Sequence, residues 1–139
     1  MNDLTSKNIG DIGEFHACAY LERNGYSITA RNLHVSKKEI DIIAEKDDVI
    51  AFVEVKTRTF PARYSHPLSY GRAAEAVTYK KRMNIIEAAS AYVYENKIDK
   101  RIRFDVCEIY FAEYPDKTYK LYKLNYIDAA FDAYGNIIL

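Results

Sequence analysis

Apolar and polar residues follow two different periods along this chain, and each period predicts one kind of element. From Ile9 to about Asn24 the apolar positions recur at helical spacing. The stripe that they form consists of Glu14, Ala17, Cys18 and Leu21. Gly25 follows directly and is suited to end the helix, because glycine readily adopts the left-handed conformation of a helix end. The first element is therefore predicted to be a helix with a glutamate on its apolar stripe.

Short apolar runs with polar borders come next and predict strands. One strand is expected from Tyr26 to about Leu33, and two more at residues 40–44 and 49–55. The polar stretch EKDD separates the last two runs. We therefore expect two antiparallel strands that are joined by a tight turn.

The middle of the chain combines a loop and a second helix. Residues 59–72 hold two of the three prolines and predict an irregular loop, which is long for a small domain. A helix is then expected from about Glu75 or Thr78 to Glu95. Its core-facing positions are Met83, Ile86, Ala89 or Ser90, and Val93.

The last third predicts strands at residues 102–111 and 119–125 and a short closing helix at 126–134. The predicted order is then helix, three strands, helix and two strands. This order indicates an α/β fold of the α+β type, in which helices flank a mixed central sheet. With 139 residues, the chain has the size of one domain, residues 1–139.

Composition narrows the class of protein. Lysine plus arginine and aspartate plus glutamate number 20 each, so the chain lacks the overall basic excess of a histone-like binder. Cys18 and Cys107 lie in apolar surroundings without the spacing of a metal site, and we expect both to be reduced core residues. A secretion signal and a membrane-spanning stretch are both missing from the sequence, so we expect a cytoplasmic protein without membrane contact.

Charged residues interrupt the two strands at 40–44 and 49–55, where a sheet normally buries apolar side chains. Strand alternation places Glu39 and Asp41 on one face and Glu54 and Lys56 on the matching face of the next strand. With a two-residue turn, Asp41 lies directly across from Glu54, and Glu39 across from Lys56. With the pairing slipped by two residues, Asp41 and Glu54 become diagonal neighbours instead. Both registers cluster the two carboxylates.

The second of these strands is predicted to be central and buried, because valine and alanine occupy its other face. Buried carboxylates need a partner charge or a metal ion, and a divalent cation relieves the repulsion between two of them. Few oxygen ligands and open positions suit Mg²⁺ or Mn²⁺. The simpler alternative is a set of cross-strand ion pairs on a solvated face. That alternative leaves unexplained Glu14 on the first helix and the cations at the start of the second.

The pattern of Asp41 followed by Glu54, Val55 and Lys56, with Glu14 on the preceding helix, resembles the PD-(D/E)xK nuclease superfamily. Within it, the chain is similar to the YraN-like group of endonuclease-like proteins, which look similar to archaeal Holliday-junction resolvases. The matching positions are Gly10, Gly13 and Glu14; Ala17, Tyr20 and Leu21; Gly25 and Tyr26; Arg31 and Asn32; residues 39–44; residues 52–56 with Arg58; residues 76–78 with Lys81; and residues 103–106.

The resemblance implies a restriction-endonuclease-like αβββαβ core and metal-dependent hydrolysis of nucleic acid, with structured or branched DNA as a candidate substrate. Asp41, Glu54 and the carbonyl of Val55 would bind Mg²⁺ or Mn²⁺, and Glu14 a second metal or its water. Lys56 would orient the attacking water, with Glu39 supporting it. The expected contacts to the phosphate backbone are Lys81, Lys80, Arg82 and Arg58.

Two other functions fit the sequence. One is a non-catalytic nucleic-acid-binding module, or an accessory protein of DNA processing, with the same fold; the other is a protein-interaction module with purely structural acids. Resolvase-like action would favour a symmetric homodimer. The tyrosines of the last third, Tyr119 among them, are either base-stacking platforms or core residues. Arg103 and Asp105 are expected to form a structural salt bridge.

Overall fold

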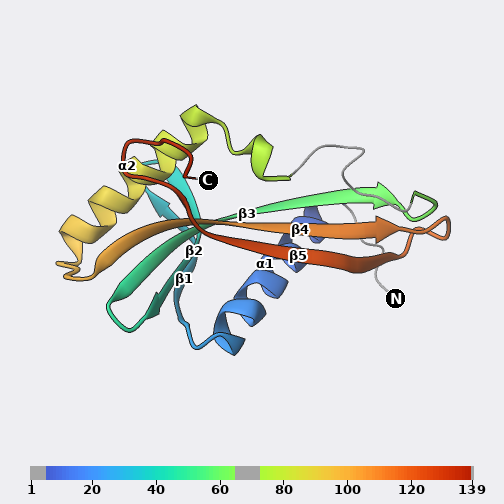
Figure 1. Cartoon of the computed structure of the whole chain (residues 1–139), viewed down its shortest axis with the longest axis horizontal. Coiled ribbons are helices and arrows are strands. Elements are labelled where there is room, and N and C mark those ends of the chain that lie inside the picture. The colour runs from blue at the N-terminus through green and yellow to red at the C-terminus, as the bar shows by residue number, and fades with distance from the viewer. Residues whose placement is uncertain (1–5, 65–72, 139) are drawn as a thin grey trace.

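The computed structural model describes residues 6–64 and 73–138 of the chain, and Figure 1 shows their arrangement. They form two α-helices, a short 3-10 helix and a five-stranded sheet. In chain order the elements are α1 (Ser6–Arg23), β1 (Ser27–Val35), β2 (Lys38–Lys46), β3 (Val49–Pro61), η2 (Ala73–Ala76), α2 (Tyr79–Glu95), β4 (Arg101–Glu113) and β5 (Tyr119–Phe131).

The strands lie in the sheet in the same order as in the chain, β1-β2-β3-β4-β5. Only β3 and β4 pair in parallel, and η2 and α2 form the crossover that a parallel pair requires. α1 packs on one face of the sheet and α2 on the other, each with its own apolar cluster. The predicted helix-flanked mixed sheet of the α+β class is confirmed.

α1 buries the predicted stripe against β2, β3 and β4. Ala17 and Leu21 are completely buried, and Cys18 is nearly so. Gly13 brings the helix close to β3, because a Cβ atom at this position would lie 2.3 Å from the Oγ1 atom of Thr57. Gly25 follows the helix with φ of 89°, which confirms its predicted role.

α2 begins at the second of the two predicted starts. Thr78 has an extended backbone, and its hydroxyl accepts a hydrogen bond from the N–H of Lys81 at 3.2 Å, as an N-cap residue does. Ile86 and Ala89 are buried among the apolar residues of this face, whereas Ser90 is exposed. The helix therefore packs on the sheet by its predicted apolar side, and of the two alternatives Ala89 and Ser90 it is Ala89 that faces the core.

The β2–β3 hairpin adopts the first of the two predicted registers. Lys46 pairs with Val49 and Ile42 with Val53 around a turn at Asp47 and Asp48. Asp47 has φ of 53°, a conformation that aspartate tolerates better than most residues. The next position after the Ile42–Val53 pair would set Asp41 against Glu54.

Residues 126–134 were predicted as a closing helix, and this prediction is wrong. β5 continues as a strand to Phe131, which then forms a bridge with Ile137. Tertiary contacts override the local pattern here: the phenol of Tyr126 and the N–H of Ala129 both donate to buried Asp105. Phe131 also stacks on Phe104, with ring centroids 5.1 Å apart.

The predicted loop at 59–72 begins too early. Thr59, Phe60 and Pro61 belong to β3, because they pair with the last residues of β4. Residues 65–72 lie outside the described part of the chain, so the prediction of a loop stands untested there.

The expected salt bridge between Arg103 and Asp105 is confirmed. Two guanidinium nitrogens each lie 2.9 Å from a carboxylate oxygen of Asp105, which is fully buried. Tyr26 accepts a further hydrogen bond from the Arg103 guanidinium, so the pair ties the start of β1 to β4. None of the described helices has the length and apolarity needed to cross a bilayer.

Candidate active site

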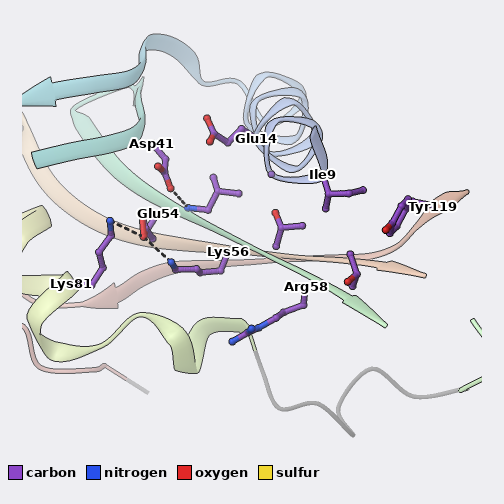
Figure 2. A pocket seen from close by; sticks show the side chains of 12 residues that line it. Ile9, Glu14, Asp41, Glu54, Lys56, Arg58, Lys81 and Tyr119 are labelled. Carbon is purple, nitrogen blue, oxygen red and sulfur yellow. Dashed lines mark hydrogen bonds and ion pairs between the residues drawn. The ribbon is translucent and has the colours of Figure 1, made fainter. Parts of the chain in front are cut away.

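The sheet forks at the end of the β2–β3 ladder, and a cleft opens at the fork. Beyond the Ile42–Val53 pair, β2 leaves β3, whereas β3 continues beside β4 as far as Pro61. The cleft has a volume of about 490 Å³ (Figure 2). Its lining residues are Ile9, Gly10 and Glu14 of α1, Asp41 of β2, residues 54–59 of β3, Lys81 of α2 and Tyr119 of β5.

Asp41 takes over the place of a ladder bond at the fork. Its Oδ2 atom accepts a hydrogen bond from the N–H of Val55 at 2.9 Å. The N–H and C=O groups of one strand residue point to the same edge, so the carbonyl of Val55 is directed to the side of Asp41 as well. The fork therefore gathers a carboxylate and a main-chain oxygen on one edge of β3.

Glu54 is the most deeply buried charged residue of the cleft, with 3% of its surface exposed. Burial, followed by a hydrogen bond to Asp41 and the charge of Asp41, raises its pKa from 4.5 to about 8. Lys56 and Lys81 oppose this change, with Nζ atoms 3.6 and 3.7 Å from Glu54 Oε2. The two lysines come from different elements, and Figure 2 shows both directed at the same carboxylate.

Glu14 faces the same cleft from α1. Its Oε1 atom is buried and finds no hydrogen-bond donor in the described residues. Burial and then the charge of Asp41 raise its pKa from 4.5 to about 7, although Arg31 and a hydrogen bond with Asn32 act in the opposite direction. A buried carboxylate oxygen without a donor is a site where a cation or a water molecule is needed.

The oxygen atoms at the fork fit a small divalent cation. Within residues 6–64 and 73–138, no group of three or more Asp, Glu, His or Cys side chains is arranged to hold a metal. A hexacoordinate Mg²⁺ commonly uses one or two carboxylates and keeps several waters. Asp41, Glu54 and the Val55 carbonyl would supply two carboxylates and a main-chain oxygen to such an ion, and Glu14 Oε1 lies in the same cleft.

Comparison with known proteins places the chain in a family. The model of a family described as uncharacterised protein family UPF0102 matches residues 13–109, a span that contains the larger part of α1, the fork and most of β4. The chain belongs to the UPF0102 family. A UPF0102 protein of Clostridium perfringens is 42% identical over 127 residues, which cover 91% of this chain and 95% of the relative.

Further UPF0102 proteins are similar along nearly their whole length. The relative from Alkaliphilus oremlandii is 42% identical over 129 residues, covering 91% of this chain and 99% of its own. That from Chlorobium phaeobacteroides is 41% identical over 126 residues, covering 90% and 94%. The resemblance to the YraN-like group is thus confirmed at the level of the family. The family description names no reaction.

The remaining predicted site residues of this UPF0102 chain lie in different surroundings. Arg58 is exposed on β3 and lines the cleft, whereas Lys80 is exposed on α2 and does not line it. Arg82 donates to the carbonyls of Gly135 and Val77 at 2.7 and 2.6 Å, so it ties the C-terminal turn to α2. Glu39 is exposed, pairs with His34 of β1 and does not line the cleft.

Several lining residues were not predicted from the sequence of this UPF0102 protein. Thr57 and Thr59 were not predicted to line the site, because the strand was expected to end at residue 55, although its alternating pattern continues. Gly10 was noted only as part of a motif. Tyr119, left open between stacking and core roles, is half-buried against the α1 side of the sheet and reaches the cleft with its remaining surface.

Proposed function

We propose that this UPF0102 protein is a Mg²⁺- or Mn²⁺-dependent endonuclease of the PD-(D/E)xK type, acting on nucleic acid and most favourably on structured DNA. The observation that carries the proposal is the convergence at the fork of β2 and β3. Asp41, Glu54 and Lys56 come together there with Lys81 from the opposite helix. Buried acids with raised pKa values beside an oxygen without a donor indicate a site that is completed by a cation.

Different residues of the cleft would bind the metal ion, orient the attacking water and stabilise the charge on the phosphate. Asp41, Glu54 and the Val55 carbonyl would hold the ion, which supplies polarisation of a phosphate oxygen and a lowered pKa of bound water. Lys56 lies 3.6 Å from Glu54 and is one-third exposed, so its ammonium can orient the attacking water and offset charge growing on the phosphate. Glu14 Oε1, which has no other donor among the described residues, would accept a hydrogen bond from that water.

Lys81 contributes from the other wall of the cleft. Its ammonium lies 3.7 Å from Glu54, and its side chain is 37% exposed, so it can release the carboxylate and contact a non-bridging phosphate oxygen. Thr78 fixes its main chain at the start of α2. The second helix therefore presents one cation to the acids of the sheet.

A second candidate is a nuclease-like module that binds nucleic acid without cutting it. Two observations favour it: both lysines already pair with Glu54, and the described His, Cys, Asp and Glu side chains do not form a three-membered metal group. Under this alternative the lysines neutralise a buried acid, and metal is not required for binding.

The test uses labelled duplex, single-stranded, flapped and four-way-junction DNA and the matching RNA, each with Mg²⁺, Mn²⁺ or EDTA. We expect cleavage that requires the metal and is lost in Asp41→Asn, Glu54→Gln and Lys56→Ala. Glu95→Gln, at an exposed position on α2, is the control that retains cleavage. Metal-independent binding without any cleavage, in wild type and variants alike, would support the binding module instead.

A further inference from the structure

β3 has an open edge that begins at the candidate active site. Its pairing with β2 ends at Val53, while its pairing with β4 continues to Pro61. The N–H of Val55 points toward β2, because it donates to Asp41. Strand groups alternate between edges, so the N–H groups of Thr57 and Thr59 point to the same open edge. No acceptor in the described residues binds either of them.

The open edge offers a row of donors on the floor of the cleft. Thr57 and Thr59 add their hydroxyl groups to the two free N–H groups, and Arg58 lies between them on the side away from α1 (Figure 2). Arg58 is exposed and has no hydrogen bond or ion pair with any described residue. N–H groups, hydroxyls and a guanidinium are the groups by which proteins bind phosphate oxygens.

Gly10 leaves open space on the side of the cleft that α1 forms. A Cβ atom here would have no neighbour within 4 Å, in contrast to Gly13, where it would collide with Thr57. Close packing therefore requires glycine at position 13 and gives no reason for one at position 10. A glycine inside a helix lowers helix stability relative to alanine. The empty space beside Gly10 belongs to the cleft, so its absent side chain leaves room for a ligand.

The cleft is longer than one phosphate. Residues 54–59 of β3 line it over about 16 Å, at about 3.3 Å per residue. This length exceeds that of a single phosphate group, so a bound strand would place more than one phosphate along the cleft. Figure 2 shows the acids at one end and Tyr119 with Ile9 at the other. The tyrosine ring offers a stacking surface where a strand would leave the cleft.

We infer that the cleft binds an unpaired nucleic-acid strand that continues from the scissile phosphate along the open edge of β3 toward Tyr119. This inference rests on the proposed function and names its substrate class, a branch, flap or tail with a single-stranded segment beside the cut. The cleft wraps one edge strand between α1 on one side and Arg58 and Lys81 on the other. A cleft of about 490 Å³ holds a segment of one backbone and is too small for both strands of a duplex.

A peptide could also pair with an open strand edge, as an added β-strand. Side-chain chemistry favours nucleic acid here. Lys56, Arg58 and Lys81 all line the cleft, and its three acids, Glu14, Asp41 and Glu54, lie together at the end where a metal ion would bind, so that residues 55–59 of β3 add no further acid. The open edge carries N–H and C=O groups in alternation and would serve either ligand, whereas the three cations match a polyanion and an added β-strand requires no particular charge.

The binding arm of the test uses fluorescence anisotropy with oligonucleotides of one sequence in EDTA. The probes are a blunt duplex, the same duplex with a 5′ or a 3′ single-stranded tail, and the tail alone. We expect one of the tailed duplexes to bind at least about tenfold more tightly than the blunt duplex. Equal binding of blunt and tailed duplexes would overturn the inference. Failure to bind any of these probes would also overturn it and would leave the open edge to a peptide.

Two variants assign the tail to the cleft. Gly10→Leu fills the space beside α1 and should weaken binding of the tailed duplex by about tenfold, with a melting temperature no lower than that of wild type, since leucine favours helices. Arg58→Ala should weaken binding and reduce the slope of log K against log salt concentration by about 0.7. Ser90→Leu, the same enlargement at an exposed site on α2, is the matched control with unchanged affinity.

The cleavage arm separates this inference from the proposed function. Tail-dependent binding that Gly10→Leu weakens, together with metal-dependent cutting near the tail, supports both. Cutting of blunt and tailed duplexes at equal rates, unaffected by Gly10→Leu, overturns the inference and leaves the nuclease in place. Tail-dependent binding with no cutting in Mg²⁺ or Mn²⁺ overturns the nuclease and retains the cleft as a single-strand binding site.

Discussion

Replacing Glu54 with glutamine should stabilise the metal-free protein at alkaline pH. Below about pH 4.5 the carboxyl is protonated in both the folded and the unfolded state. As the pH rises, the unfolded chain releases its proton near 4.5, whereas the folded protein retains it until its pKa of about 8. The folded state then binds more protons than the unfolded one, so the free energy of unfolding falls across this window.

The size of the effect follows from the difference between these two pKa values. At about 1.4 kcal/mol per pH unit, it sets an upper limit of about 5 kcal/mol lost by pH 8. Glu54→Gln removes this loss but also deprives Lys56 and Lys81 of the acid they pair with. We expect a net gain of about 1–3 kcal/mol over wild type at pH 8, and almost none at pH 4.5.

Urea unfolding in EDTA at several pH values between 4.5 and 8 measures this difference directly. Glu95→Gln serves as the control, because it removes an exposed acid from α2 and should leave the pH dependence unchanged. Titration with Mg²⁺ at pH 8 should raise the stability of wild type and not that of Glu54→Gln. A constant difference between wild type and Glu54→Gln at all pH values would refute the assignment of Glu54 as a destabilising buried acid.

Three further predictions concern the scaffold around the site. Gly13→Ala should lower the melting temperature, because the new methyl group would lie 2.3 Å from Thr57 Oγ1, whereas Gly10→Ala should leave it unchanged or raise it; calorimetry of the two proteins decides this. Thr78→Ala should cost about 1 kcal/mol of stability in urea unfolding through loss of the α2 cap, and Thr78→Ser should restore most of it. Asp105→Ala should cost about 3–5 kcal/mol, since it leaves Arg103 without its carboxylate, and unfolding of the variant at the wild-type denaturant midpoint would contradict this.

Periodicity predicted most of the fold correctly, and it failed where tertiary contacts decide. The β2–β3 register followed from the position of a two-residue turn at Asp47 and Asp48. The strand conformation of residues 126–131 did not follow from the local sequence. It depends on hydrogen bonds to Asp105, which lies on a different strand, β4. The full length of β3 was also missed, since its last residues are fixed by pairing with β4 beyond the end of β2.

In the candidate site, too, local periodicity predicted some residues correctly and tertiary contacts decided the others. The proximity of Asp41, Glu54 and Lys56 could be predicted from the sequence, because strand alternation and one turn determine their positions. Glu39 was expected across from Lys56, but its side chain is exposed and no ion pair joins the two residues in the described structure. The separation of β2 from β3 beyond the Ile42–Val53 pair explains this, and no local sequence pattern indicates where a sheet forks. Arg82 bonds to main-chain carbonyls that only the folded chain brings near it.

Single-turnover cleavage of a tailed or branched DNA, in Mn²⁺ and in EDTA, tests the central claim most directly. The proteins are wild type, Asp41→Asn and Lys56→Ala, each shown to be folded by circular dichroism. We predict a metal-dependent product from wild type and a loss of at least about a hundredfold in rate in both variants. Equal product from wild type and the variants, or no product from folded wild type on any tailed or branched DNA, would contradict a metal-dependent nuclease at the fork of β2 and β3.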